Sequence, residues 1–158
     1  MGYIEDLRKL VGHRPLILPG AVVFIVDELG RILLQQRKHP KKFWGIPGGL
    51  MELGESPEET AKREIHEETG LIIEDLHLMN VYAGADHFVI AENGDEFYPV
   101  TIAYYTNNFK GEMNIDKSES IQCVFFHPHE LPNNILKNYQ RILKNFITFH
   151  YPKMRNQG

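Results

Sequence analysis

The stretch of residues 48–71 constrains the fold more than any other part of the chain, because a glycine-rich loop there leads into a helix whose two ends are both marked. Residues 56–59 read Ser-Pro-Glu-Glu: the serine can cap free helix amides, the proline suits the first helical position, and the second glutamate completes a capping box. Gly70 is the natural end, because a glycine just past a helix adopts the left-handed conformation at little cost. The pattern predicts a helix from about Pro57 to Thr69, roughly 20 Å long at about 1.5 Å per residue.

Three glutamates share one face of that predicted helix. Glu64, Glu67 and Glu68 are related by steps of three and four residues, so their carboxylates repel one another unless a cation neutralises them. Carboxylate oxygens are the ligands that Mg²⁺ or Mn²⁺ prefers, and Glu55 in the preceding loop can fold back toward the same cluster. Arg63 can orient one carboxylate through a bidentate contact. The alternative is a solvated acidic face, which we disfavour because the loop, the cap and the stop accompany the charges.

The spacing within residues 49–71 is highly specific. It reads Gly, five residues, Glu, seven residues, Arg-Glu-Ile, one residue, Glu-Glu, one residue, Gly-Leu. This run resembles an intact Nudix box, with every defining position filled. The resemblance implies a divalent-metal hydrolase, using Mg²⁺ with Mn²⁺ as a possible substitute. Such enzymes cleave a phosphoanhydride bond in a nucleoside diphosphate linked to another group. It also implies the Nudix α/β fold, an α/β/α sandwich with a mixed β-sheet, the Nudix loop and helix, and a C-terminal helix.

The resemblance suggests roles for individual residues. The carbonyl of Gly48 is an implied metal ligand beside the carboxylates, so the metal set is Gly48, Glu55, Glu64, Glu67 and Glu68. Arg63 is implied to orient the catalytic carboxylates. Arg37 ends a predicted strand and is a candidate phosphate ligand.

A carboxylate must also take the proton of the attacking water, and here the sequence leaves alternatives open. Glu64 is one choice. Glu119 is the other, because the family often brings a further acidic residue from this part of the fold, although a solvated loop glutamate is the competing interpretation. Asp116 and Glu112 are weaker candidates.

Length and composition indicate an ordinary globular protein. A chain of 158 residues suits one domain with a substantial core, and we expect a single Nudix domain over residues 1–158. The net charge of −4 argues neither for nor against nucleic acid. Cys123 is the only cysteine, so an intrachain disulfide is excluded, and its apolar neighbours favour a buried residue over a catalytic thiol. The sequence shows no signal peptide or membrane span, which predicts a cytoplasmic protein without a membrane partner.

The flanking chain predicts strands and two further helices. Ile4, Leu7, Leu10 and Val11 form an apolar stripe that predicts an N-terminal helix over residues 3–11. Asn93-Gly94 between two strand-like runs is a strong hairpin signal, Pro99 suggests a sheet edge or bulge, and Trp44 is expected to pack under the active loop. The predicted strands are 20–26 and 31–37 as a hairpin, 71–83 with an interruption near 74–75, 86–91, 96–106 and 121–126, followed by a helix at about 133–149 and frayed residues 153–158.

Partners and substrate are less constrained. Lys137, Arg141 and Lys144 share one side of the last predicted helix, which favours a solvated face over a nucleic-acid contact. A homodimer through the N-terminal helix or edge strands is a possible assembly. The marks of ADP-ribose and dinucleoside polyphosphate enzymes are not clean, so nucleoside triphosphates, nucleotide sugars and RNA 5′ ends stay open, with a small nucleotide preferred. The competing hypotheses are an RNA 5′ pyrophosphohydrolase and a non-catalytic Nudix-fold nucleotide sensor.

Overall fold

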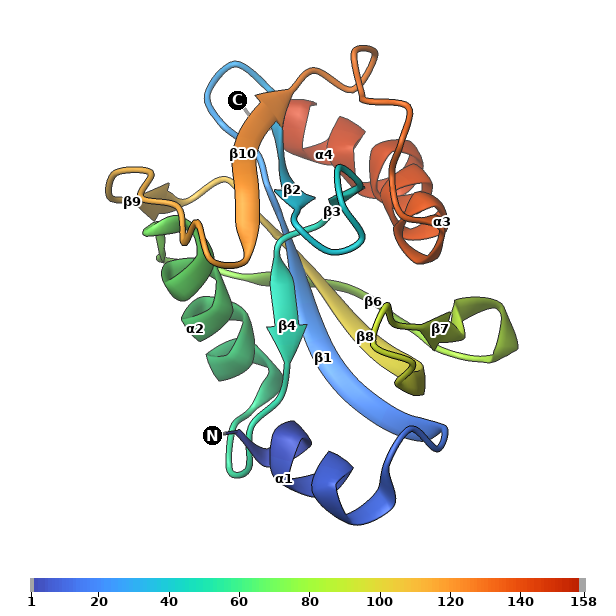
Figure 1. The fold of residues 1–158 in the computed structure, drawn as a ribbon. Coiled ribbons are helices and arrows are strands. Elements are labelled where there is room, and N and C mark those ends of the chain that lie inside the picture. Colours follow the sequence, from blue (N-terminus) through green and yellow to red (C-terminus); the bar gives the residue numbers. More distant parts are fainter. Residues whose placement is uncertain (1, 157–158) are drawn as a thin grey trace.

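The computed structural model describes residues 2–156, and Figure 1 shows strands flanked by helices. No helix in this described part is long and apolar enough to cross a bilayer. The elements in chain order are α1 (Tyr3–Val11), β1 (Leu16–Ile25), β2 (Ile32–Arg37), β3 (Trp44–Gly45), β4 (Gly48–Leu50), α2 (Pro57–Thr69), β5 (Ile72–Ile73), β6 (His77–Tyr82), the 3₁₀ turn η1 (Ala85–His87), β7 (Val89–Ile90), β8 (Glu96–Thr106), β9 (Phe109–Lys110), β10 (Ser120–Phe126), α3 (Lys137–Asn145), the π-helical turn η2 (Phe146–His150) and α4 (Tyr151–Asn156).

The main sheet is mixed, and its strand order is β4-β1-β8-β6, with β7 also paired to β8. β1 and β8 run parallel from Leu16 opposite Phe97 to Ile25 opposite Thr106, whereas the other pairs in this sheet are antiparallel. A second sheet has the order β10-β2-β3, and β5 pairs with β9. This arrangement confirms the predicted Nudix-type α/β fold.

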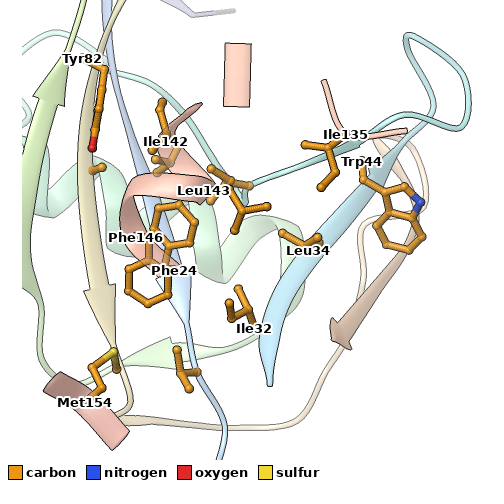
Figure 2. Close-up of a cluster of buried hydrophobic side chains, with 14 residues drawn as sticks. Phe24, Ile32, Leu34, Trp44, Tyr82, Ile135, Ile142, Leu143, Phe146 and Met154 are labelled. Carbon is orange, nitrogen blue, oxygen red and sulfur yellow. The ribbon is translucent and has the colours of Figure 1, made fainter. Parts of the chain in front are cut away.

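Two hydrophobic clusters lie on opposite faces of β1, because successive strand residues point to opposite sides. Ala21, Val23 and Ile25 pack with Ala61 and Ile65 of α2. The alternate residues pack with α3, η2 and α4 in the second cluster, drawn in Figure 2. This cluster contains Val22, Phe24, Val26, Ile32, Leu34, Trp44, Ile46, Tyr82, Ala103, Ile135, Ile142, Leu143, Phe146 and Met154.

Aromatic contacts fix the second cluster. The rings of Phe24 and Phe146 stack with centroids 4.3 Å apart, which joins β1 to η2. Trp44 lies edge-on against Phe126 at 5.0 Å and is buried, so its indole belongs to this cluster, on the face of β1 opposite α2. Stacked and edge-on aromatic pairs of this kind add specific packing to the burial of apolar area.

The predicted hairpin between the first two long strands is wrong as a sheet pairing. The turn does close, with Asp27 N donating to Arg31 O at 3.0 Å and an isolated bridge between Val26 and Ile32. Beyond that bridge β2 does not pair with β1, which pairs with β8 along its whole length and with β4 at residues 20–22. β2 enters the second sheet instead. The Asn93-Gly94 hairpin is confirmed, because β7 pairs antiparallel with β8 around it.

Other boundaries differ from the predicted ones for identifiable reasons. The helix expected from residue 133 begins at Lys137, because the preceding residues bond to β3: Trp44 N donates to Asn134 O and Leu136 N donates to Trp44 O, both at 2.9 Å. Its helical continuation reaches Asn156 rather than fraying from residue 153, because Met154 is buried in the core, and the last two residues of the predicted frayed segment, 157–158, lie outside the described residues.

Two strand predictions also need correction. The run 71–83 has its predicted interruption near residues 74–75, but its two parts, β5 and β6, belong to different sheets rather than to one strand. The run 86–91 contains the turn η1 and only a two-residue strand. Pro99 lies inside β8 rather than on an edge strand. Only the edge of β8 that faces β1 is paired at this position, because on the other edge the pairing with β6 stops at Thr101 and the pairing with β7 stops at Phe97.

Candidate active site

The helix α2 and the loop before it form as the sequence predicts. Ser56 Oγ accepts from Glu59 N at 3.1 Å, Pro57 occupies the first turn, and Gly70 is left-handed with φ 78°. The apolar side of α2 packs through Ala61 and Ile65 against the sheet. This packing fixes the rotation of the helix and therefore which glutamates face the sheet.

Glu64 and Glu68 are the two carboxyl groups that α2 brings together. They hydrogen-bond one another, and Glu68 is only 5% exposed. Burial, with the Glu64 charge beside it, raises the pKa of Glu68 to about 9. Burial also raises the pKa of Glu64, although Arg63 opposes this effect. Two carboxyl groups in contact in a buried place cannot both ionise without a large cost, and a bound cation would remove that cost.

Two glycines allow the backbone of β4 to pass close to these carboxyl groups. Gly48 N donates to Glu68 Oε2 at 3.3 Å, and a Cβ on Gly48 would collide with the carbonyl of Ala21 in the neighbouring strand. A Cβ on Gly49 would lie 2.5 and 2.7 Å from the two carboxylate oxygens of Glu64. Gly48 therefore allows β4 to lie close to β1, and Gly49 allows β4 to lie close to Glu64 of α2.

Arg63 donates hydrogen bonds to three acidic side chains of the loop and helix. Its Nε and Nη2 donate to the two oxygens of Glu55 at 2.5 and 2.8 Å, and its Nη1 donates to Glu64 at 2.9 Å and Glu67 at 3.3 Å. Hydrogen bonds from Arg63 lower the pKa of Glu55 to about 2. Glu55 therefore folds back as expected, but it contacts Arg63 rather than the Glu64–Glu68 pair. Glu67 lies at the rim with its side chain 57% exposed.

Arg37, at the end of β2, is half-buried, and the charges of Glu68 and Glu64 act on it. Its Nη2 donates to Tyr139 Oη at 3.1 Å, and its guanidinium lies over the Tyr139 ring, 5.6 Å from the centroid. Tyr139, followed by the acidic Glu68, Glu119 and Glu64, raises the pKa of Arg37. Its Nε is buried without a hydrogen-bond partner. The sequence analysis missed Tyr139, which is 102 residues away from Arg37 along the chain and has no local motif to reveal it.

The other acidic candidates lie farther from the pair. Glu119 is exposed, and its charge acts on Arg37. Asp116 N donates to the carbonyl of Glu68 at 3.1 Å, but its carboxylate is bonded by Ser118, which lowers the pKa of Asp116. Glu112 is exposed, and its carbonyl oxygen lies against Gly70.

A cavity of about 950 Å³ adjoins this site. Gly48 and Gly49 line it directly above Glu68 and Glu64, and Arg37 and Tyr139 form another part of the wall. The β7–β8 hairpin supplies residues from Val89 to Asn93 and Phe97. Among the described lining residues, Arg37 is the only lysine or arginine.

The acidic side chains of α2, in the arrangement described, provide only part of a divalent-cation site. Within residues 2–156, no three His, Cys, Asp or Glu side chains are grouped closely enough to form a ready metal site. The buried Glu64–Glu68 pair nevertheless offers carboxyl oxygens, which are the ligands that Mg²⁺ or Mn²⁺ prefers, and a bound cation would favour the ionised form of both groups. Glu67 lies at the exposed rim, where its carboxylate accepts from Arg63 at 3.3 Å.

Known proteins resemble this chain over most of its length. The sequence is 30% identical to an ADP-ribose pyrophosphatase of Methanocaldococcus jannaschii, over 90% of this chain and 80% of the relative. It is 30% identical to a putative 8-oxo-dGTP diphosphatase of Bacillus subtilis, over 80% and 78%. It is 28% identical to the NAD-capped RNA hydrolase NudC of Vibrio parahaemolyticus, but it spans only 42% of that longer protein.

The structural comparison agrees with the sequence comparison. A MutT NUDIX hydrolase from Burkholderia pseudomallei superposes with a TM-score of 0.70 at 28% identity, covering 82% of this chain and 98% of that one. The NUDIX domain pattern itself matches residues 17–146. Together with the loop, helix and acidic residues described above, this match shows that the chain belongs to the Nudix family of hydrolases.

Proposed function

We propose that the protein is a divalent-metal-dependent pyrophosphohydrolase that cleaves the phosphoanhydride bond of a nucleoside diphosphate linked to another group. The observation that carries this proposal is the buried Glu64–Glu68 pair, which lies beneath Gly48 and Gly49 in the wall of the cavity with Arg37 nearby. Carboxyl oxygen donors and a half-buried guanidinium beside one cavity match the needs of a diphosphate and its counter-ion.

The metal would be held by Glu64 and Glu68, with Glu67 and the Gly48 carbonyl as further oxygen donors. Mg²⁺ is the proposed ion and Mn²⁺ a substitute. When bound, such an ion supplies neutralisation of the diphosphate charge and polarisation of its phosphorus–oxygen bonds. Glu55 is better assigned to holding Arg63 than to the metal, because both of its oxygens already accept hydrogen bonds from Arg63.

Protein side chains bind the phosphate, orient Glu64 and take the proton of the attacking water. Arg37 binds the phosphate oxygens, and Tyr139 holds its guanidinium in place. Arg63 fixes Glu64 while leaving one of its carboxylate oxygens free of that contact. Either Glu64 or Glu119 takes the proton of the attacking water. Glu119 is exposed on the Arg37 side of the site, so both candidates stay open.

The cavity favours a small nucleotide with a short phosphate chain. One arginine among the described lining residues suits a diphosphate better than a longer polyphosphate, whose extra charges need more cations. The apolar wall, which includes Pro40, Leu136 and Phe97, suits a nucleoside. ADP-ribose is the first compound to test, because a relative covered over most of its length is named for that activity.

Product analysis after incubation with Mg²⁺ or Mn²⁺ tests the proposal. The panel contains ADP-ribose, nucleotide sugars, dinucleoside polyphosphates, normal and oxidised nucleoside triphosphates, NAD-capped RNA and 5′-triphosphorylated RNA. We expect one small diphosphate-linked nucleotide to be turned over fastest, with release of a nucleoside monophosphate. Faster turnover of an RNA end would replace this proposal with an RNA pyrophosphohydrolase. Tight nucleotide binding without turnover would replace it with a sensor.

A further inference from the structure

The β7–β8 hairpin is the least anchored wall of the cavity. β7 has only two residues and pairs with β8 at two positions, Val89 opposite Phe97 and Ile90 opposite Glu96. Its turn nevertheless supplies Glu92 and Asn93 to the cavity, and Phe97 lines it from β8. A two-stranded ribbon of this length is marginally stable by itself, so its position depends on what holds it from outside.

Arg8 of α1 holds the base of this hairpin. Its Nη2 donates to the carbonyl of Glu96 at 2.7 Å, and its Nη1 donates to the carbonyls of Gly12 and Arg14 at 3.0 and 2.7 Å. The side chain is only 11% exposed, which is unusual for an arginine on a surface helix. One guanidinium therefore ties the end of α1, the chain leading to β1 and the first residue of β8 together.

Asp95 ties the turn itself to the same N-terminal segment. Its carboxylate accepts from His13 Nδ1 at 2.7 Å and lies 3.6 Å from Arg8 Nε. The backbone adds a further bond, because Glu96 N donates to the carbonyl of His13 at 3.2 Å. Figure 1 shows the chain between α1 and β1 passing beside the start of β8.

The opposite side of the turn meets the loop that follows Arg37. His39 Nδ1 and Glu92 Oε2 lie 2.9 Å apart, and both residues line the cavity. This contact is exposed on both sides, so it contributes little energy by comparison with the Arg8 cluster. The hairpin thus spans the cavity from a firm attachment at α1 to a weak one at His39.

We propose that Arg8 and Asp95 are positioning residues, through which the N-terminal helix holds the β7–β8 hairpin against the bound nucleotide and sets its affinity. The inference rests on the proposed function, since it assigns the hairpin to the same cavity. Arg8 and the rest of α1 precede residues 17–146, which match the NUDIX domain, whereas Asp95 lies within them. Neither residue touches the acidic pair, so the chemical step is expected to be unaffected.

Steady-state kinetics of Arg8→Met and Asp95→Ala test this role, with Arg31→Met as the matched control. Arg31 also forms a close ion pair with an aspartate, Asp27, but neither residue lines the cavity. We expect the Arg8 and Asp95 variants to raise KM for ADP-ribose, or for the best substrate of the panel, by about tenfold with kcat within about twofold. That pattern is the signature of lost uniform binding. Arg31→Met is expected to keep the wild-type KM and kcat.

Two readouts separate positioning from general stability. Amide exchange in residues 89–97 is expected to speed up in Arg8→Met and not in Arg31→Met. Variants that lose thermal stability but keep the wild-type KM would overturn the inference. If Arg8→Met does not fold, the KM of Asp95→Ala alone decides the test.

If the wild type turns over nothing, the proposed function fails. Calorimetric affinities for ADP then test the role of the hairpin, and equal affinities in wild type and variants would overturn the inference.

Discussion

Replacing Glu68 by glutamine should stabilise the metal-free protein while abolishing its turnover. Glu68 is buried next to Glu64, and its pKa is raised from 4.5 to about 9. An unfolded chain ionises this residue near its ordinary pKa, so the native state binds one more proton than the unfolded state between these two values. The free energy of unfolding therefore falls as the pH rises through this window.

The magnitude follows from the same two pKa values. At pH 7 the native protein keeps Glu68 neutral at a cost of 1.36 kcal/mol for each pH unit above 4.5, or about 3 kcal/mol in all. Glutamine carries no such cost and retains an oxygen that can accept from Gly48 N. Since the hydrogen bonds of the glutamine are expected to be less favourable, we expect Glu68→Gln to increase the free energy of unfolding by about 1–3 kcal/mol. In a chain of this length that gain raises Tm by several degrees, at about 2–4 °C per kcal/mol.

The assay is thermal unfolding of chelator-treated protein between pH 5 and 9, followed by circular dichroism. Wild type is expected to lose stability across the window, and Glu68→Gln to stay nearly flat. Glu67→Gln is the matched control, because the side chain of Glu67 is 57% exposed and has no comparable burial cost. Added Mg²⁺ should stabilise the wild type and not Glu68→Gln, because a ligand that binds only the native state raises its stability.

Two results would refute this reasoning. A metal-free Glu68→Gln protein that is less stable than wild type at pH 7 would mean that the buried carboxyl group carries no ionisation cost. A folded Glu68→Gln protein with wild-type turnover would mean that Glu68 is not a metal ligand in the reaction.

Further variants test the glycine contact and the phosphate site. Gly49→Ala should keep the fold but lose at least tenfold in kcat, because its Cβ would displace the Glu64 carboxylate; wild-type rates in a folded variant would contradict this. Arg37→Met should raise KM and lower kcat for every substrate, because it removes the half-buried cation that lines the cavity, and unchanged kinetics would remove Arg37 from the phosphate site.

The local structure of the active loop and helix could be predicted because its signals are local. Ser56, Pro57 and Gly70 fix the ends of α2 through contacts within a few residues, and the helix has the predicted bounds. The period of the glutamates correctly placed Glu64 and Glu68 side by side. The same period could not tell that Glu67 would face outward, because the rotation of α2 depends on its packing against the sheet.

Long-range pairing was harder to predict. The strands of residues 16–37 look like a hairpin locally, but β1 is already paired on both edges by β4 and by β8, whose partner residues are about 30 and about 80 positions away. The contacts of Tyr139 with Arg37, and of Arg8 with the β7–β8 hairpin, are equally distant in sequence. No composition or spacing rule reveals such contacts. The single domain, the cytoplasmic location and the homodimer stay predictions.

Metal-stripped protein, titrated with Mg²⁺ in the presence of ADP-ribose or the best substrate of the panel, gives the most direct test. The account predicts no hydrolysis without the ion, a saturable rise in released nucleoside monophosphate as Mg²⁺ is added, and no rise in Glu68→Gln. Equal hydrolysis in the stripped and the Mg²⁺-loaded wild-type protein would contradict the claim that Glu64 and Glu68 form a metal-dependent catalytic site.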